Sequence, residues 1–343
     1  MVITARDTEY TDDGGVIYHN IIDNNGDLNF SSICIDGAED FYINATEEKI
    51  QYIIDSYDKK INKYIVMIDY GEAALSKKSS IINKFPGIQI IYNVFKRNGI
   101  FHKLVWRSNG LNPQIKTDIK FEPITFFLGR DIKHMFHIES RKFQHHFLSL
   151  YRAYKPIREH FHKFLVDTDI ISKTLFSYNS EGLKNTKHTF DYSVSLENKS
   201  VDTKMLMKPG DYFKNTFCSL VYEAYWNEKV VFFTEKLNKC ILAGQPFIII
   251  STPKYLNYLK KMGFKTFNKW WDESYDLEID DNKRIKKIEN IINEISTWDL
   301  EKCKEIYKEM IPILKDNQEI LKSISTNRVD DTYHLIKLKQ NII

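Results

Sequence analysis

The chain has 343 residues and is nearly neutral, because 49 lysines and arginines stand against 46 aspartates and glutamates, for a net charge of +3. This length is ample for two domains of ordinary size, and a hydrophobic content of 43% indicates folded cores rather than disorder. The balanced charge argues against a protein that coats nucleic acid. A local basic face is still compatible with this net charge.

The cysteines and the first residues both predict a cytoplasmic protein. The four cysteines are scattered without a C-x-x-C pair, so we expect reduced thiols in the core: Cys34, Cys218, Cys240 and Cys303. Polar and acidic residues follow the first Met, which predicts that there is no signal peptide. No apolar run has the length that a membrane span requires.

Residues 1–140 are expected to form an α/β domain of their own. Asp, Asn and Gly in the first 30 residues indicate turns between short strands. The expected elements that follow are a strand at 31–35, a helix at 46–58, a strand at 61–68, a helix at 76–85 and a strand at 87–95. This alternation is typical of a parallel sheet.

Carboxylates that could serve as a general base follow the expected strand at 61–68. Asp69 and Glu72 lie just past its carboxyl end, which is where α/β proteins bind their ligands. Asp131 and Glu139 are alternatives further along the chain. A base would be needed if the protein transfers a group to a hydroxyl, because the hydroxyl proton must be removed.

A cluster of cations marks the next strand–helix junction. A strand is expected at residues 147–151, followed by Arg152, Lys155 and Arg158 where a helix to residue 166 begins. Backbone N–H groups, the helix dipole and guanidinium groups together favour phosphate at such a place. The alternative is an ordinary solvated helix start. Among the three cations, Arg158 is the preferred phosphate ligand.

A second strand of this region ends on a carboxylate. After a strand at 170–179 and a long polar loop at 180–208, the run at 217–223 reads as a strand closing on Glu223. At a strand end, Glu223 could accept hydrogen bonds from ribose or sugar hydroxyls. The alternative is a glutamate that caps a helix or forms an ion pair.

The most informative stretch begins at Thr234. Thr234 is expected to cap a helix, Glu235 suits the positive end of the helix dipole, and Lys236 adds a point charge for phosphate. Apolar residues then turn one face inward, Gly244 ends the helix in the left-handed conformation, and residues 247–250 form a buried strand. The alternative is a helix start with a surface ion pair.

The remaining chain is expected to be mostly helical. Helices are expected at 253–262, 284–295 and 300–321, with a turn at 272–276. Pro312 should kink or break the last helix.

No metal site is expected. Six histidines gather between residues 134 and 162, without a partner set typical of zinc: His134, His137, His145, His146, His160 and His162. The sequence also has no P-loop, no G-x-G-x-x-G and no nucleophile elbow.

The residues from Val221 onward resemble a known group of enzymes. Val221-Tyr-Glu223, Phe233-Thr-Glu-Lys236 and Ala243-Gly-Gln-Pro-Phe247 are similar to the donor-binding half of GT-B glycosyltransferases, namely the α1,3-fucosyltransferases and exostosin-like enzymes. The likeness continues to Trp271-Asp-Glu-Ser-Tyr-Asp276, a pattern similar to glycosyltransferase-like proteins of large viruses and phages. It covers roughly residues 141–295.

The resemblance implies both a fold and a set of roles. It implies two Rossmann-like domains facing a cleft, with an acceptor-side domain at 1–140, a nucleotide-sugar domain at 141–300 and a helical tail at 301–343 that packs back. It also implies that Glu223, Thr234, Glu235 and Lys236 contact the nucleotide sugar and that a basic strand–helix junction, here with Arg152 and Arg158, assists. The base would come from the first domain, as Asp69 or Glu72.

The expected function is therefore a metal-independent, inverting transfer of a sugar from a nucleotide donor to a glycan or another hydroxyl, with no cofactor. One alternative is a phage or viral enzyme that glycosylates hydroxymethylated bases in DNA, for which the lysines between residues 184 and 204 could supply a basic surface. Another is a non-catalytic binding protein that keeps the fold. Golgi members of the resembled families carry a membrane anchor, and this chain departs from them there.

Overall fold

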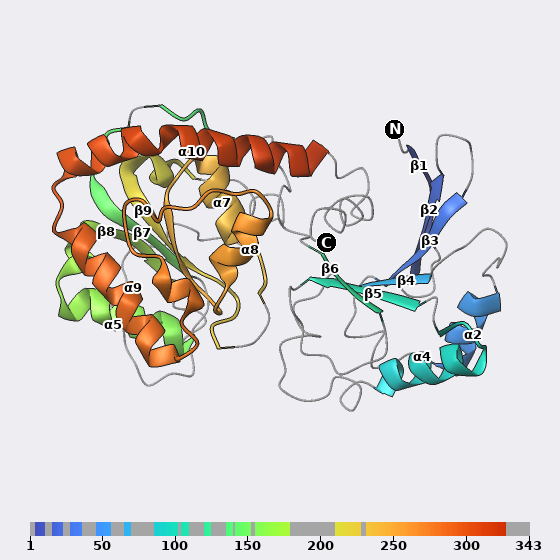
Figure 1. Ribbon diagram of the computed structural model, residues 1–343. Helices are drawn as coiled ribbons and strands as arrows, with labels where there is room; N and C mark the ends of the chain where they lie inside the picture. Colours follow the sequence, from blue (N-terminus) through green and yellow to red (C-terminus); the bar gives the residue numbers. More distant parts are fainter. Residues whose placement is uncertain are drawn as a thin grey trace. The chain divides into compact units, whose positions relative to one another are not determined.

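Two β-sheets, each with its own helices, form the described part of the computed structural model (Figure 1). The structure describes residues 4–10, 16–22, 28–35, 46–55, 65–69, 86–101, 104–109, 120–124, 135–139, 141–151, 155–178, 210–227 and 231–326. The chain divides into two compact units by its internal contacts. The first unit is Met1–Phe126, Glu228–Phe232 and Thr326–Ile343, and the second is Phe127–Asn227 and Phe233–Ser325.

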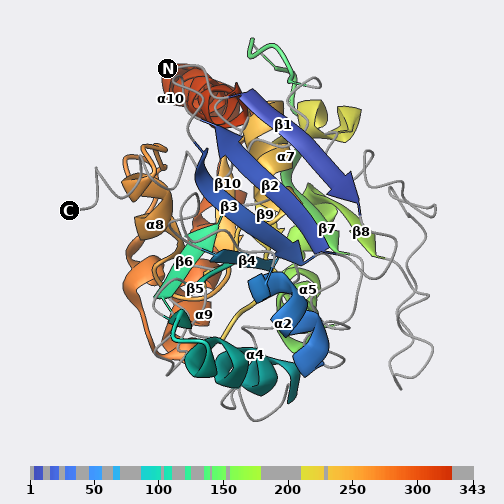
Figure 2. The ribbon, with the colours of Figure 1, turned by 90° about the vertical axis from the view of Figure 1, so that its right-hand side faces the viewer.

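The first unit contains a six-stranded sheet whose strands lie in chain order (Figure 2). The strands are β1 (Thr4–Tyr10), β2 (Val16–Ile22), β3 (Leu28–Ile35), β4 (Ile65–Asp69), β5 (Leu104–Asn109) and β6 (Lys120–Ile124). The pairs from β1 to β3 are antiparallel and those from β3 to β6 are parallel. The sheet is therefore mixed, and its parallel part confirms the expected strands near 31–35 and 61–68.

The described helices of the first unit lie against each other. They are α2 (Glu47–Asp55) and α4 (Pro86–Arg97). Gln51 of α2 exchanges side-chain hydrogen bonds with Asn98, which follows α4, at 3.4 and 3.0 Å. Right-handed crossovers between sequential parallel neighbours leave their helices on one face of the sheet, which accounts for this pairing.

Helix α4 corrects the prediction of a strand at residues 87–95. The run is rich in β-branched residues, which favour strands. Ile91, Val94 and Phe95 nevertheless follow the i, i+3, i+4 spacing of a helix, and both Val94 and Phe95 are buried. Pro86 stands at the first helical position, where its fixed φ and missing N–H are tolerated. Helical spacing and the proline therefore outweigh strand propensity here.

The second unit contains four parallel strands in the order β10-β9-β7-β8. They are β7 (His145–Tyr151), β8 (Thr174–Tyr178), β9 (Thr216–Tyr222) and β10 (Phe247–Ile250). The chain order reverses between β7 and β9, because β7 pairs with β8 on one side and with β9 on the other. Right-handed crossovers then place the helices that follow β7 and β9 on opposite faces of this sheet.

Helices cover both faces of the second sheet, as Figure 1 shows. The longer helices are α5 (Pro156–Asp167), α7 (Glu235–Ala243), α9 (Asp281–Ser296) and α10 (Leu300–Thr326), and the shorter ones are η3 (Ile170–Lys173), η5 (Asp211–Asn215), α8 (Tyr255–Lys261) and η6 (Ser274–Leu277). His160 of α5 lies 3.0 Å from Glu289 of α9, and Tyr307 of α10 donates to the carbonyl of Gly244 after α7. The α/β class with C-terminal helices is confirmed.

Four expectations, three about the second unit and one about the first, need correction or lie outside the described residues. The strand expected from residue 170 begins only at Thr174, because residues 170–173 form η3. Pro312 does not break α10, which is continuous through it. The helix expected at 76–85 and the loop expected at 180–208 lie outside the described residues.

The position of Pro312 explains why α10 continues. A proline inside a helix removes one backbone hydrogen bond and costs about 3 kcal/mol. Pro312 is exposed, so the carbonyl that it leaves unbonded can face water. On the opposite stripe of α10, Tyr307, Met310 and Leu314 are each at most 2% exposed. Burial of such side chains stabilises the helix by about 1.5–3 kcal/mol each, which outweighs the proline.

Helix α7 is buried on every side, whereas the sequence predicted one buried face. All residues from 237 to 243 are buried. The C-terminal end is covered by α10 and by the segment 135–139, since Gln318 donates to the carbonyl of Leu242 at 2.9 Å and the amide of Phe136 donates to the same carbonyl at 2.8 Å. Gly244 ends the helix with φ +61°, as predicted.

Gly244→Ala should destabilise the second unit more than Gly263→Ala. Both glycines have positive φ, so each alanine costs about 1 kcal/mol of backbone strain. A Cβ on Gly244 would lie 2.3 Å from a side-chain carbon of Ile138, whereas on Gly263 the nearest atom is at 3.9 Å. Overpacking adds about 1–3 kcal/mol at position 244 only. Urea denaturation measures the difference, and equal losses for the two variants would contradict it.

Candidate functional site

The reversal of strand order between β7 and β9 defines where a ligand is expected in the second unit. In open parallel sheets, ligands bind beyond the carboxyl ends of the strands at the point where the strand order reverses. Strand β7 ends at Tyr151 and β9 ends at Tyr222, and the two strands pair directly. The segments that leave these strand ends carry the basic junction and Glu223, so two separate predictions meet at one edge of the sheet.

Two cations from the β7–α5 junction reach the carboxyl end of β9. The Nζ of Lys155 donates to the carbonyl of Ala224, and the Nη2 of Arg158 donates to the carbonyl of Tyr222 at 3.4 Å. Arg158 is buried, with 4% of its surface exposed. Two of the three predicted cations therefore lie at the carboxyl end of β9. Arg152 lies outside the described residues.

The N-terminus of α7 carries the predicted cap and ion pair. The hydroxyl of Thr234 accepts from the amide of Lys236 at 3.2 Å, which is the bond expected of an N-cap. The Nζ of Lys236 lies 2.9 Å from the carboxylate of Glu235 and 3.2 Å from the hydroxyl of Thr234. Burial works to raise the pKa of Glu235, but the charge and hydrogen bond of Lys236 outweigh it, so this pKa is lowered. Glu235 is therefore a carboxylate near neutral pH.

Glu223 is turned toward the protein interior. Its carboxylate accepts from the hydroxyl of Thr234 at 2.5 Å, from the amide of Thr234 at 3.3 Å and from the hydroxyl of Tyr255 at 2.6 Å. Only 2% of Glu223 is exposed. Burial raises the pKa of Glu223, while the charge of Lys236 and the two hydroxyls oppose that rise. The carboxylate is thus held by three donors from two other segments.

The structure brings together most of the described candidates for donor binding. Arg158 contacts the last carbonyl of β9, Glu223 follows it directly, and Glu223 contacts Thr234. No role was predicted for Tyr255, whose hydroxyl contacts Glu223 from the first position of α8. Its signal was weak, because a tyrosine at a helix start is common on any surface.

The candidates for the general base remain predictions. Asp69 is the last residue of β4, where its backbone pairs with β3 and β5, but its side chain lies outside the described residues. Glu72 and Asp131 also lie outside them. Glu139 is exposed in the segment 135–139 of the second unit.

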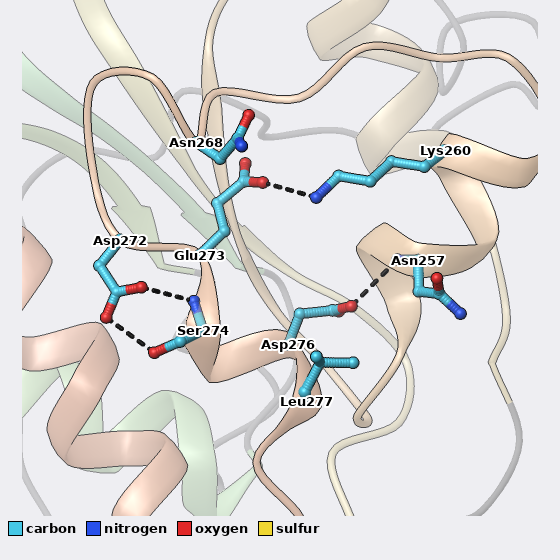
Figure 3. Close-up of a pocket in the computed structure, with 8 residues that line it drawn as sticks. All are labelled: Asn257, Lys260, Asn268, Asp272, Glu273, Ser274, Asp276 and Leu277. Carbon is cyan, nitrogen blue, oxygen red and sulfur yellow. Dashed lines mark hydrogen bonds and ion pairs between the residues drawn. The ribbon is translucent and has the colours of Figure 1, made fainter.

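The Trp271–Asp276 pattern forms a polar pocket whose carboxylates hold the fold (Figure 3). The pocket has a volume of about 370 Å³, and its lining is Asn257, Lys260, Asn268, Asp272, Glu273, Ser274, Asp276 and Leu277. Asp276 accepts from the amides of Leu256 and Asn257 at 2.7 and 3.0 Å, which caps α8. Glu273 accepts from the amide of Phe267 at 2.7 Å and from Lys260 at 3.1 Å. These acids therefore support the loops around α8.

The described histidines and cysteines considered next are buried or hydrogen-bonded within the second unit. His146 is hydrogen-bonded to the carbonyl of Trp298 at 2.7 Å, and burial lowers the pKa of His162 to about 4. Among the described residues, no group of three or more His, Cys, Asp or Glu is arranged to hold a metal ion. Cys218, Cys240 and Cys303 are buried thiols outside any disulfide, as expected for core cysteines.

Comparison with known proteins gives no family assignment. No protein-family model matches the chain, and no curated protein matches it. Within the part of the chain that the structure describes, no helix has the apolar length needed to cross a bilayer. Function is therefore inferred from the geometry at the carboxyl edge of the second sheet and from the resemblance of the motifs.

Glu223→Gln should change how stability depends on pH. Since burial raises the pKa of folded Glu223 above the value of about 4.3 in the unfolded chain, its contribution to stability is full below the unfolded pKa. That contribution is lost as the pH rises through the folded pKa. The difference in unfolding midpoint between Glu223→Gln and the wild type should therefore change in favour of the variant as the pH rises from about 4.3 through the raised pKa of the folded carboxyl group.

Thermal unfolding across this pH range measures the effect, and Glu301→Gln is the control. Glu301 is exposed on α10, with 78% of its side chain in solvent. Its replacement should leave the pH profile parallel to that of the wild type. A parallel profile for Glu223→Gln would contradict the raised pKa.

Proposed function

We propose that the second unit binds the diphosphate of a nucleotide sugar at the carboxyl edge of β7 and β9, and that the protein is a glycosyltransferase. The proposal is based on one observation: positively charged side chains gather at the carboxyl ends of β7 and β9, where the order of the strands reverses. Lys155 and Arg158 contact the end of β9, and Lys236 lies at the N-terminus of α7, which follows the same strand. A helix N-terminus with nearby cations is a favourable place for phosphate.

These groups suit the leaving group of a sugar transfer. In that reaction the acceptor oxygen forms a bond to the anomeric carbon while the bond from that carbon to the diphosphate breaks, and the electron pair remains on the phosphate oxygen. Lys236, Arg158 and the amides of α7 would stabilise this developing negative charge. Their positions are fixed by the sheet before any ligand arrives, which reduces the reorganisation needed during reaction.

Glu235 would accept hydrogen bonds from the ribose. Its side chain is 19% exposed and is held beside Lys236, so a carboxylate oxygen stands next to the proposed diphosphate position. The acceptor hydroxyl needs a base to take its proton, and Asp69 and Glu72 remain our candidates for this role. The resemblance to fucosyltransferases and exostosin-like enzymes supports the same distribution of roles.

Lys236→Ala should weaken binding of the nucleotide sugar by about 10- to 100-fold, because a charged hydrogen bond to phosphate contributes about 1.5–3 kcal/mol. The measurement is a thermal-shift panel of UDP-, GDP-, ADP- and CMP-linked sugars with and without EDTA, followed by titration of the best ligand. A ligand that binds the native state raises the melting temperature by mass action.

Lys265→Ala is the matched control for charge removal. Lys265 is 54% exposed and pairs with Asp316 of α10, so its loss should leave the nucleotide-sugar affinity unchanged. No thermal shift with any nucleotide sugar would contradict the proposal. Binding without release of a nucleoside diphosphate, across glycan and hydroxymethylated DNA acceptors, would instead favour the non-catalytic binding protein.

A further inference from the structure

We propose that Glu223 is a positioning residue for the anion site: through Thr234 it fixes the first amides of α7 and the ammonium of Lys236, without contacting the ligand itself. This inference rests on the proposed function, because it assigns a role in the same site. It differs from the expectation that Glu223 accepts hydrogen bonds from sugar or ribose hydroxyls. The geometry that supports it is a chain of hydrogen bonds from a buried carboxylate to Lys236.

The hydroxyl of Thr234 is the central link of this chain. A threonine hydroxyl offers one hydrogen and two lone pairs. Its hydrogen is donated to Glu223 at 2.5 Å, and its oxygen accepts from the amide and from the Nζ of Lys236, each at 3.2 Å. Because Glu223 accepts this bond, it sets the direction of the hydroxyl hydrogen. Both lone pairs are then left for Lys236.

The other carboxylate oxygen ties the same group to α8. The Oε1 of Glu223 accepts from the amide of Thr234 at 3.3 Å and from the hydroxyl of Tyr255 at 2.6 Å. The amide of Glu223 donates to the carbonyl of Ile250 at 3.1 Å, which joins the ends of β9 and β10. The side chain of Glu223 thus connects the starts of α7 and α8, and its backbone amide connects the ends of β9 and β10. Tyr255 donates to Oε1 of Glu223, whereas the hydroxyl of Thr234 donates to Oε2.

A glutamine at position 223 cannot reproduce this arrangement. Its amide has the shape of the carboxylate, but one of its two ends donates instead of accepting. If the NH₂ group faces the hydroxyl of Thr234, it competes with Lys236 for a lone pair and leaves the hydroxyl hydrogen without its acceptor. If it faces the amide of Thr234, two donors oppose each other. Either orientation therefore disturbs Thr234, the first at its hydroxyl, which contacts Lys236, and the second at its backbone amide, where α7 begins.

The test compares Glu223→Gln with Tyr255→Phe. The first variant reverses the polarity next to Thr234, whereas the second removes a bond to the same buried carboxylate and leaves the link to Lys236 intact. Both should lower the melting temperature. The first readout is the affinity for inorganic pyrophosphate and for the nucleotide sugar that shifts the wild type, and the second is hydrogen exchange at the amide of Lys236 without ligand.

We expect about 10-fold weaker anion binding and about 10-fold faster exchange at Lys236 for Glu223→Gln, the loss of roughly one hydrogen bond. Tyr255→Phe should stay within about twofold of the wild type in both readouts. Equal effects of the two variants, or no effect of Glu223→Gln beyond the melting temperature, would show that Glu223 only supports the fold.

Two further outcomes keep the inference separate from the proposed function. If Glu223→Gln does not fold, Thr234→Val is the second variant, because it removes the same hydroxyl link with little change in shape. It should weaken pyrophosphate binding to a similar degree. Unchanged binding would overturn the inference. If the wild type binds neither pyrophosphate nor a nucleotide sugar, the proposed function fails, while exchange at Lys236 still decides whether Glu223 positions this residue.

Discussion

The carboxyl edge of the second sheet depends on one buried carboxylate. Glu223 leaves the end of β9, and its two oxygens hold the start of α7 through Thr234 and the start of α8 through Tyr255. A buried carboxylate without such donors would be costly, because burial removes its hydration. Three donors offset this cost, and in return the carboxylate fixes the distance between segments that otherwise share no strand pairing.

The same physical logic places the cations at this edge. Arg158 donates to the carbonyl of Tyr222, the last residue of β9, and Lys155 donates to the carbonyl of Ala224 just after the strand. These contacts hold the β7–α5 junction against the end of β9. The positive charges of Lys155 and Arg158 therefore lie where the order of the strands reverses. An anionic ligand is the natural complement of this surface.

The C-terminal part of the chain supports this edge from behind. Tyr275 accepts a hydrogen bond from the amide of Ile249 at 3.2 Å, which satisfies an outward-facing group of the edge strand β10. Asp276 caps α8, and α10 covers the end of α7 through Tyr307 and Gln318. The conspicuous Trp271–Asp276 pattern is accounted for by the protection of a strand edge and a helix start. It therefore needs no ligand to explain its acids.

The sequence by itself determined the features that follow from local chemistry. Thr234 as a cap, Gly244 as a stop and the buried strand after it were all predictable, because caps and left-handed turns depend on a few neighbouring residues. Local rules failed at α4, where β-branched residues suggested a strand. The helix break that Pro312 could have caused is absent, because tertiary burial outweighs the proline. The candidate base at Asp69 stays a prediction.

Only the tertiary structure decided which residues meet. Glu223 contacts Thr234 across 11 residues and Tyr255 across 32, and Arg158 reaches Tyr222 across 64. Such contacts are set by the order of the strands in the sheet. No local pattern encodes this order, because the residues within a strand do not specify which other strands lie beside it. The sequence located the charged groups of the candidate site, and the fold decided that Glu223 turns inward while Lys236 and Glu235 stay partly in solvent.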